Sequence, residues 1–230
     1  MKQFVNVIKQ NISPIRNGCC FLILITMVVW CITRTVSPVH PADSTEITEA
    51  SIRDEHIKSL IVWETAYSQE VEDVIVCNMN MLPDSIIESW LSLDSHIVVC
   101  PNIKGYLDKY HLNIEEKGSY TTGYTRISSD GDTIIGADIY ILGSKININT
   151  SLIHEMGHYV YYEYFGVNTD YVLPNYDIDS VRFSKTEYGS NYYSSSSKEY
   201  FAQIFAYVIM QGTVEEYPDA AIMTKIIENF

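Results

Sequence analysis

The chain has 230 residues, 47% of them hydrophobic, and its 11 glycines and 7 prolines are too few for a disordered or collagen-like protein. A chain of this length can bury a substantial core in one compact domain. All 29 acidic residues lie after position 36, against 11 basic ones. We therefore expect no nucleic-acid binding, because such an acidic surface repels a phosphate backbone.

The N-terminus has the pattern of a targeting segment. Residues 19–32 are an apolar run behind a basic leader without acids, which predicts that 1–36 is a signal peptide or an N-terminal membrane anchor. The two alternatives stay open, since no clear cleavage site follows. Residues 37–50, with two prolines, read as a linker to one domain at 51–230. Either alternative places this domain outside the cell, secreted or anchored, with membrane contact only through the N-terminal segment.

Of the five cysteines, only Cys77 and Cys100 lie outside the targeting segment. Two cysteines are too few for a disulfide framework. They could form one bridge, or be small buried hydrophobic residues at strand ends, and we favour the second alternative.

The first half of the domain alternates predicted helices and strands. A capping box of Ser85 and Glu88 precedes a helix face of apolar residues at Ile86, Ile87, Trp90 and Leu91. Short β-branched runs on either side predict buried strands. The expected order is a helix around 52–67, a strand at 71–77, a helix from 85 and a strand at 96–100.

The next stretch predicts a β-hairpin. Asp130-Gly131 is a turn signal between strands at 124–127 and 133–135. A further strand at 137–142 is expected directly before the following helix. It is either a sheet edge, to which an extended peptide could add, or an ordinary internal strand.

Residues 154–158 read His-Glu-Met-Gly-His, and the surrounding pattern predicts a helix from an N-cap at 149, 150 or 151 to just before Gly166. Leu152, Ile153, Met156 and Val160 form the expected core face of this helix. His154 and His158 lie on the opposite face, one turn apart, where both imidazoles can reach one metal ion beside Glu155. Gly157 is unfavourable inside a helix, so we expect close packing against it.

Two further helices are predicted near the C-terminus. One runs over 197–211 and ends before Gly212, and the other begins near Pro218. The buried face of the last helix is expected to consist of Ile222, Met223, Ile226, Ile227 and Phe230.

A catalytic zinc site needs a third protein ligand besides two histidines. No histidine follows His158, which excludes the metzincin arrangement, where a third histidine stands at the position of Tyr164. Among the downstream acids, Glu163 points to the wrong face of its helix. Glu199 is best placed, in the first turn of the next long helix, with Ala202 and Ala206 beside it to allow close helix packing.

These residues resemble a known family. The His154 to His158 motif, together with residues 191–206 (NYYSSSSKEYFAQIFA), is similar to the catalytic domain of anthrax lethal factor and to the secreted Pro-Pro endopeptidases of Gram-positive bacteria. The resemblance implies that Glu199 is the third zinc ligand. It also implies that Tyr192 stabilises the oxyanion, although Tyr188 and Tyr193 are neighbouring alternatives.

The chain departs from the family pattern at one position near this site. Gln203 stands where the family commonly has an acid. Its amide oxygen can still orient a ligand histidine, but it lacks the charge of a carboxylate, so we expect a weaker metal site.

The combined expectation is an α+β, zincin-like metallopeptidase domain. A small mixed sheet would pack on the active-site helix, and two lobes, the second mainly helical, would meet near 149–158. His154, His158 and Glu199 would hold one Zn²⁺ ion, with Glu155 as general base for a zinc-activated water and Tyr192 as oxyanion donor.

The expected activity is hydrolysis of peptide bonds in a protein or peptide substrate. Its sequence stays open, because the Pro-Pro endopeptidases imply a proline preference and lethal factor does not. The alternative function is an inactive zincin-like module that binds a peptide or a surface. The sequence does not indicate an oligomeric state.

Overall fold

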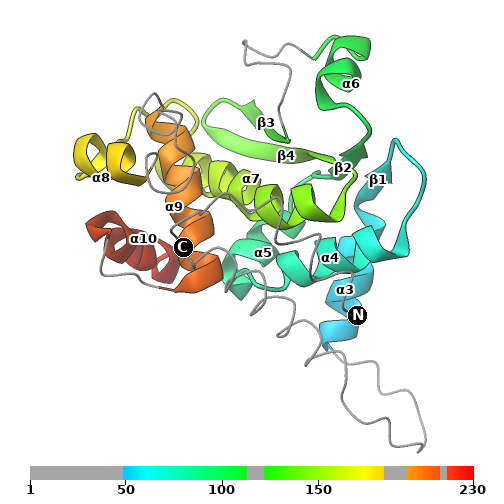
Figure 1. Ribbon diagram of the computed structural model, residues 1–230, viewed down its shortest axis with the longest axis horizontal. Coiled ribbons are helices and arrows are strands. Elements are labelled where there is room, and N and C mark those ends of the chain that lie inside the picture. The colour runs from blue at the N-terminus through cyan, green and yellow to red at the C-terminus, as the bar shows by residue number, and fades with distance from the viewer. Residues whose placement is uncertain (1–48, 113–121, 184–195, 213–216) are drawn as a thin grey trace, which may run out of the picture. The chain divides into compact units, whose positions relative to one another are not determined.

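The computed structural model describes residues 49–112, 122–183, 196–212 and 217–230, shown in colour in Figure 1. The predicted targeting segment at 1–36, nearly all of the linker, and Tyr188, Tyr192 and Tyr193 lie outside these ranges. The residues from Ile47 to Phe230 cluster into one compact unit. None of the described helices has both the length and the apolar character that a membrane span needs.

The described residues form a mixed α+β structure, which confirms the predicted class. It consists of a small four-stranded mixed sheet and many helices (Figure 1). In chain order the elements are α3 (Glu49–Ser59), β1 (Ile61–Trp63), α4 (Gln69–Met79), α5 (Asp84–Leu91), β2 (Ile97–Cys100), α6 (Ile103–Lys109), β3 (Gly123–Asp130), β4 (Thr133–Leu142), α7 (Lys145–Phe165), α8 (Tyr176–Phe183), α9 (Ser197–Gln211) and α10 (Pro218–Glu228).

The strands lie in the order β1-β2-β4-β3. The first three are parallel, with Ile61 opposite Ile97 and Ile97 opposite Ile139, and β3 is antiparallel to β4 with Thr125 opposite Ile139. The strand predicted at 137–142 is therefore internal, the second of the two alternatives, and β3 is the edge strand on that side. This edge strand packs against the motif helix α7.

Side chains of alternate strand residues pack on opposite faces of the sheet. One face, which includes Ile97, Ile139 and Ile141, belongs to the main core together with the buried residues of α7. The other face, with Val98 and Tyr140, packs against α6. In Figure 1, α6 and α7 lie on opposite sides of the strands.

The predicted strand at 71–77 is wrong, because these residues belong to helix α4. The Ser68 hydroxyl accepts a hydrogen bond from the Val71 amide and caps the helix. Val71, Ile75 and Met79 follow at intervals of four residues and are all buried. The β-branched residues thus form a helix face that packs against α7.

The helix expected over 52–67 is also partly wrong, since α3 ends at Ser59. Three residues of its second half, Ile61–Trp63, form strand β1, which gains its hydrogen bonds by pairing with β2. Helices α6 and α8 were not predicted. Both are short, at seven and eight residues, and carry a weak periodic signal.

The helix predicted from 85 is present as α5, with Ile86, Ile87 and Trp90 buried and Leu91 partly buried. The capping box is wrong, because Ser85 lies inside the helix and no side chain caps its N-terminus at Pro83. The proline itself is suited to the start of a helix.

The predicted hairpin is confirmed. β3 and β4 meet at Gly131, whose φ of 62° a glycine adopts without strain. The segments 133–135 and 137–142 are one continuous strand, not two. Cys100 is buried at the end of β2, Cys77 is half-buried on α4, and no disulfide bond joins them.

Helix α7 begins at an N-cap formed by Ser144, earlier than the predicted positions 149–151, and ends before Gly166 as predicted. The predicted core face is confirmed, since Leu152, Ile153, Met156 and Val160 are all buried. The packing of this helix in the core thus depends on its apolar face. The two histidines lie on the opposite face.

The two C-terminal helices have the predicted bounds. α9 starts after the Ser196 N-cap, whose hydroxyl accepts from the Glu199 amide at 3.3 Å, and ends at Gly212 with φ 81°. In α10, Met223 and Ile226 are buried and the other predicted apolar residues are partly buried against the core. α9 packs against both α7 and α10.

Candidate metal centre

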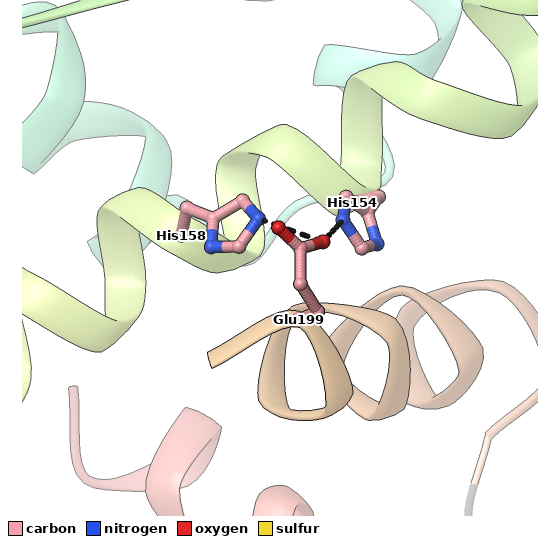
Figure 2. A group of neighbouring side chains, drawn as sticks. All are labelled: His154, His158 and Glu199. Carbon is pink, nitrogen blue, oxygen red and sulfur yellow. Dashed lines mark hydrogen bonds and ion pairs between the residues drawn. The ribbon is translucent and has the colours of Figure 1, made fainter. Parts of the chain in front are cut away.

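Helices α7 and α9 together bring three potential metal ligands to one point. His154 and His158 project from successive turns of α7, and Glu199 projects toward them from the first turn of α9 (Figure 2). Glu199 Oε2 lies 3.1 Å from His154 Nε2 and 3.6 Å from His158 Nε2. One carboxylate oxygen therefore faces the outer nitrogen of both imidazoles.

The three side chains are mostly shielded from solvent. They are 11%, 14% and 15% exposed for His154, His158 and Glu199 respectively. The two imidazole rings are 5.0 Å apart and nearly perpendicular, at 84°. The two rings therefore meet edge to face and are not stacked.

The chemistry and spacing of these donors fit a zinc ion. One ligand atom from each residue lies within 4.8 Å of the others. Two atoms bound at Zn–N and Zn–O lengths around a tetrahedral ion are roughly 3.3 Å apart. The observed separations of 3.1 and 3.6 Å are close to that value. Two imidazoles and one carboxylate also leave a fourth position for water or substrate.

Close contact between the two helices sets this geometry. A Cβ atom at Gly157 would lie 2.8 Å from Ala202 Cα and 2.9 Å from Ala202 O. The backbones of α7 and α9 therefore approach more closely than a side chain at position 157 allows. This is the close packing at Gly157 that the sequence predicts, and it brings Glu199 within reach of both histidines.

Gln203, one turn after Glu199, contacts the other ring nitrogen of His154. Its Oε1 is 3.0 Å from His154 Nδ1. Because an amide oxygen can only accept, this contact requires a proton on Nδ1 and leaves Nε2 with its lone pair for a metal. The role expected for Gln203 from the sequence is consistent with this distance.

In the metal-free protein, His154 and Glu199 shift each other's pKa values. Burial alone would lower the pKa of His154, but the hydrogen bond to Glu199 and the charges of Glu155 and Glu199 raise it overall. Burial alone would raise the pKa of Glu199, but the hydrogen bonds from His154 and His158 hold it well below its usual range. Glu199 is therefore ionised at neutral pH, as a metal ligand must be.

Glu155 lies between the two histidines in sequence and is 5% exposed. The Thr125 hydroxyl is 2.7 Å from Glu155 Oε2 and 2.9 Å from the Glu155 main-chain oxygen. Gly123, two residues earlier on β3, passes so close that a Cβ atom there would lie 2.8 Å from Glu155 Cγ. Sequence reasoning missed both residues, since no local pattern links β3 to a residue thirty positions later.

Not every predicted site residue can be placed. Tyr192 and its neighbouring tyrosines fall outside the described ranges, so its role stays a prediction. Glu163 is exposed on α7 and is not in the group of possible ligands. Tyr164, at the position of the metzincin histidine, is 40% exposed.

No protein-family model matches the chain, and no match was found among curated proteins or among solved structures. The resemblance to the lethal factor and Pro-Pro endopeptidase family therefore rests on the motif residues alone.

Proposed function

We propose that this protein is a zinc metalloendopeptidase, secreted or anchored at the cell surface, with His154, His158 and Glu199 as zinc ligands and Glu155 as general base. The observation that carries the proposal is the meeting of the three ligand atoms of His154, His158 and Glu199 from two helices, directly beside a buried glutamate. A site built only to hold structural zinc normally closes with four protein ligands and often uses cysteine.

A zinc ion in an open three-ligand site lowers the pKa of water at its free position and polarises a carbonyl. Glu155 takes the proton from the attacking water and later donates it to the nitrogen of the leaving amine. Thr125 binds Glu155 Oε2, which leaves Oε1 for this proton. Tyr192 is proposed as the hydrogen-bond donor to the developing oxyanion.

An extended peptide is the substrate that the surroundings of the site favour. β3 is an edge strand, and Gly123 and Thr125 on this strand contact the proposed base. A peptide that adds to the edge of β3 by backbone hydrogen bonds would pass beside Glu155.

The test is cleavage of a mixed peptide library by the zinc-loaded protein, with Glu155→Ala as control. We expect turnover for the wild-type protein, and for the variant a loss of activity with zinc still bound at one equivalent, because Glu155 is not a ligand. Mass spectrometry of the products reports both the cleavage and its sequence preference.

Two results would contradict the proposal. Full activity of Glu155→Ala would exclude Glu155 as the base. A wild-type protein that binds zinc and peptides but cleaves none of them would support the alternative, a binding module with a zincin-like site.

A further inference from the structure

Two residues of the edge strand β3, Gly123 and Thr125, contact the side chain of Glu155. Gly123 and Thr125 lie two positions apart and face the same side of the sheet, opposite Ile141 and Ile139 of β4. Both isoleucines belong to the core cluster that contains the buried face of α7. The side chain of Thr125 is therefore directed at α7, where it reaches Glu155.

The Thr125 hydroxyl has one proton and two acceptors on the buried Glu155, the main-chain oxygen at 2.9 Å and the nearer carboxylate oxygen Oε2. Its oxygen lies 2.7 Å from Glu155 Oε2, a short distance typical of hydrogen bonds to a charged group. Among the described residues, the side-chain hydrogen bond to the Glu155 carboxylate comes from Thr125. A glutamate side chain has several rotamers, and this bond favours one of them.

Gly123 leaves open the space that the other carboxylate oxygen occupies. A Cβ atom at this position would be 2.8 Å from Glu155 Cγ and 2.9 Å from Cδ, and would overlap Oε1. Gly123 is not among the glycines with positive φ. The close approach of the carboxylate, not a turn in the backbone, is therefore what requires glycine here.

We propose that Thr125 is a positioning residue for the general base. Its hydroxyl fixes Glu155 Oε2, and the missing side chain of Gly123 leaves space for Oε1, so that the carboxylate is held in one orientation. The inference rests on the proposed function, in which Glu155 is the base. It adds that the edge strand beside the substrate also sets the orientation of that base.

The test compares Thr125→Val, which keeps the shape and removes the hydroxyl, with Thr125→Ser, which keeps the hydroxyl. We expect Thr125→Val to lower kcat about ten- to a hundredfold with KM changed by less than about threefold, because a displaced base slows proton transfer without weakening peptide binding. Thr125→Ser should restore most of the activity. Thr133→Val, an exposed threonine at the turn of the same hairpin, is the matched control and should leave kcat unchanged.

Two measurements on the protein without substrate complete the test. Zinc affinity should be the same, within about threefold, for wild type, Thr125→Val and Thr125→Ser, since Thr125 touches no proposed ligand. A crystal structure of metal-free Thr125→Val should show the Glu155 carboxylate moved away from its wild-type position. Gly123→Ala should displace the same carboxylate and lower kcat at least as far.

Each other outcome overturns the inference. Unchanged kcat in Thr125→Val means that the hydroxyl does not position the base. An equal loss in Thr125→Ser, or a parallel loss of zinc affinity, means that Thr125 acts through packing. In all these cases the wild-type protein is active and the proposed function stands. A zinc-loaded wild type that cleaves no peptide refutes the proposed function and this inference together.

Discussion

Gln203 places a neutral amide group next to the Nδ1 atom of His154. The contact between Gln203 Oε1 and His154 Nδ1 orients the imidazole as a carboxylate would. It does so without adding a negative charge next to the proposed metal ion. The strength of metal binding is therefore where the effect of this residue should appear.

Replacing Gln203 by leucine should weaken zinc binding about ten- to a hundredfold, since His154 loses the acceptor that fixes its ring and its tautomer. Gln203→Glu should bind zinc at least as tightly as the wild type, because it keeps the acceptor and adds a charge. Competition with a chromophoric chelator measures both affinities.

The matched control is Gln211→Leu, an exposed position at the end of the same helix. It changes the same chemical groups far from His154, so zinc affinity should not change. Equal affinity of Gln203→Leu and the wild type would show that the 3.0 Å contact does not act on the metal site.

At the scale of elements, the packing of α7 on α9 determines whether a three-ligand site exists. Two ligands come from α7 and the third from α9, so any change in the distance between the helices changes the site. Gly157 and Ala202 are the contact point of the two backbones.

Gly157→Ala should therefore destabilise the protein although alanine favours helices. The gain in helix propensity is about 1 kcal/mol, whereas forcing a Cβ against the Ala202 backbone costs about 1–3 kcal/mol or more. We expect a net loss of about 1 kcal/mol in unfolding free energy and a weaker zinc affinity, measured by chemical denaturation and by chelator competition.

Gly105→Ala in α6 is a suitable control, because a Cβ there meets only the Asn102 side chain at 3.4 Å, an ordinary contact. This variant should be as stable as the wild type or more stable, with unchanged zinc affinity. If Gly157→Ala behaved in the same way, the close approach of α7 and α9 would not be needed for the site.

At the scale of the whole molecule, protons would compete with the proposed zinc ion for the same residues. The lowered pKa of Glu199 stabilises the metal-free fold above the unfolded pKa of a glutamate, about 4.3, and this stability is lost as pH falls through the lower folded value. The raised pKa of His154 stabilises the fold below about pH 6.5, and this stability is lost as pH rises through the higher folded value. The metal-free site is thus most favourable between about pH 4.5 and 6.5.

Zinc binds neutral histidine, so its stabilising effect should grow as pH rises. With zinc at about a hundred times its dissociation constant, binding adds about 2.7 kcal/mol, or roughly 5–10 °C in Tm for a domain of this size. We expect this shift near pH 7.5, a much smaller one at pH 5.5 at the same zinc concentration, and its reversal by a chelator. Differential scanning calorimetry measures the shift.

Glu199→Gln is the control for the pH dependence, since it removes one ligand and the charge that raises the pKa of His154. It should show little zinc-induced shift at either pH. A wild-type shift of equal size at both pH values would mean that zinc binds elsewhere than at these histidines.

Local signals were sufficient for much of the fold and for the choice of candidate ligands. The C-terminal ends of α7 and α9 follow from Gly166 and Gly212, and the core face of α7 follows from a spacing of three and four residues. The proposed ligands His154 and His158 are one turn apart for the same reason. Glu199 was chosen as the third candidate ligand from its position in the first turn of the next long helix. That position is also local information.

Sequence patterns gave wrong predictions where the partner of a residue is distant in sequence. Residues 71–77 were assigned to a strand because β-branched residues suit both a buried strand and a buried helix face, and only packing against α7 selects the helix. Strand β1 exists because β2 is beside it.

The sequence by itself determined the α+β class, the motif helix with both histidines on the face opposite its apolar residues, and the candidate ligands, because each depends on contacts within a few turns of the chain. Only the tertiary structure decided that β3 is the edge strand, that Gly157 meets Ala202, and that Gly123 and Thr125 hold Glu155. These contacts depend on sheet register and helix packing, which join residues 30 or more positions apart and leave no periodic trace in either segment.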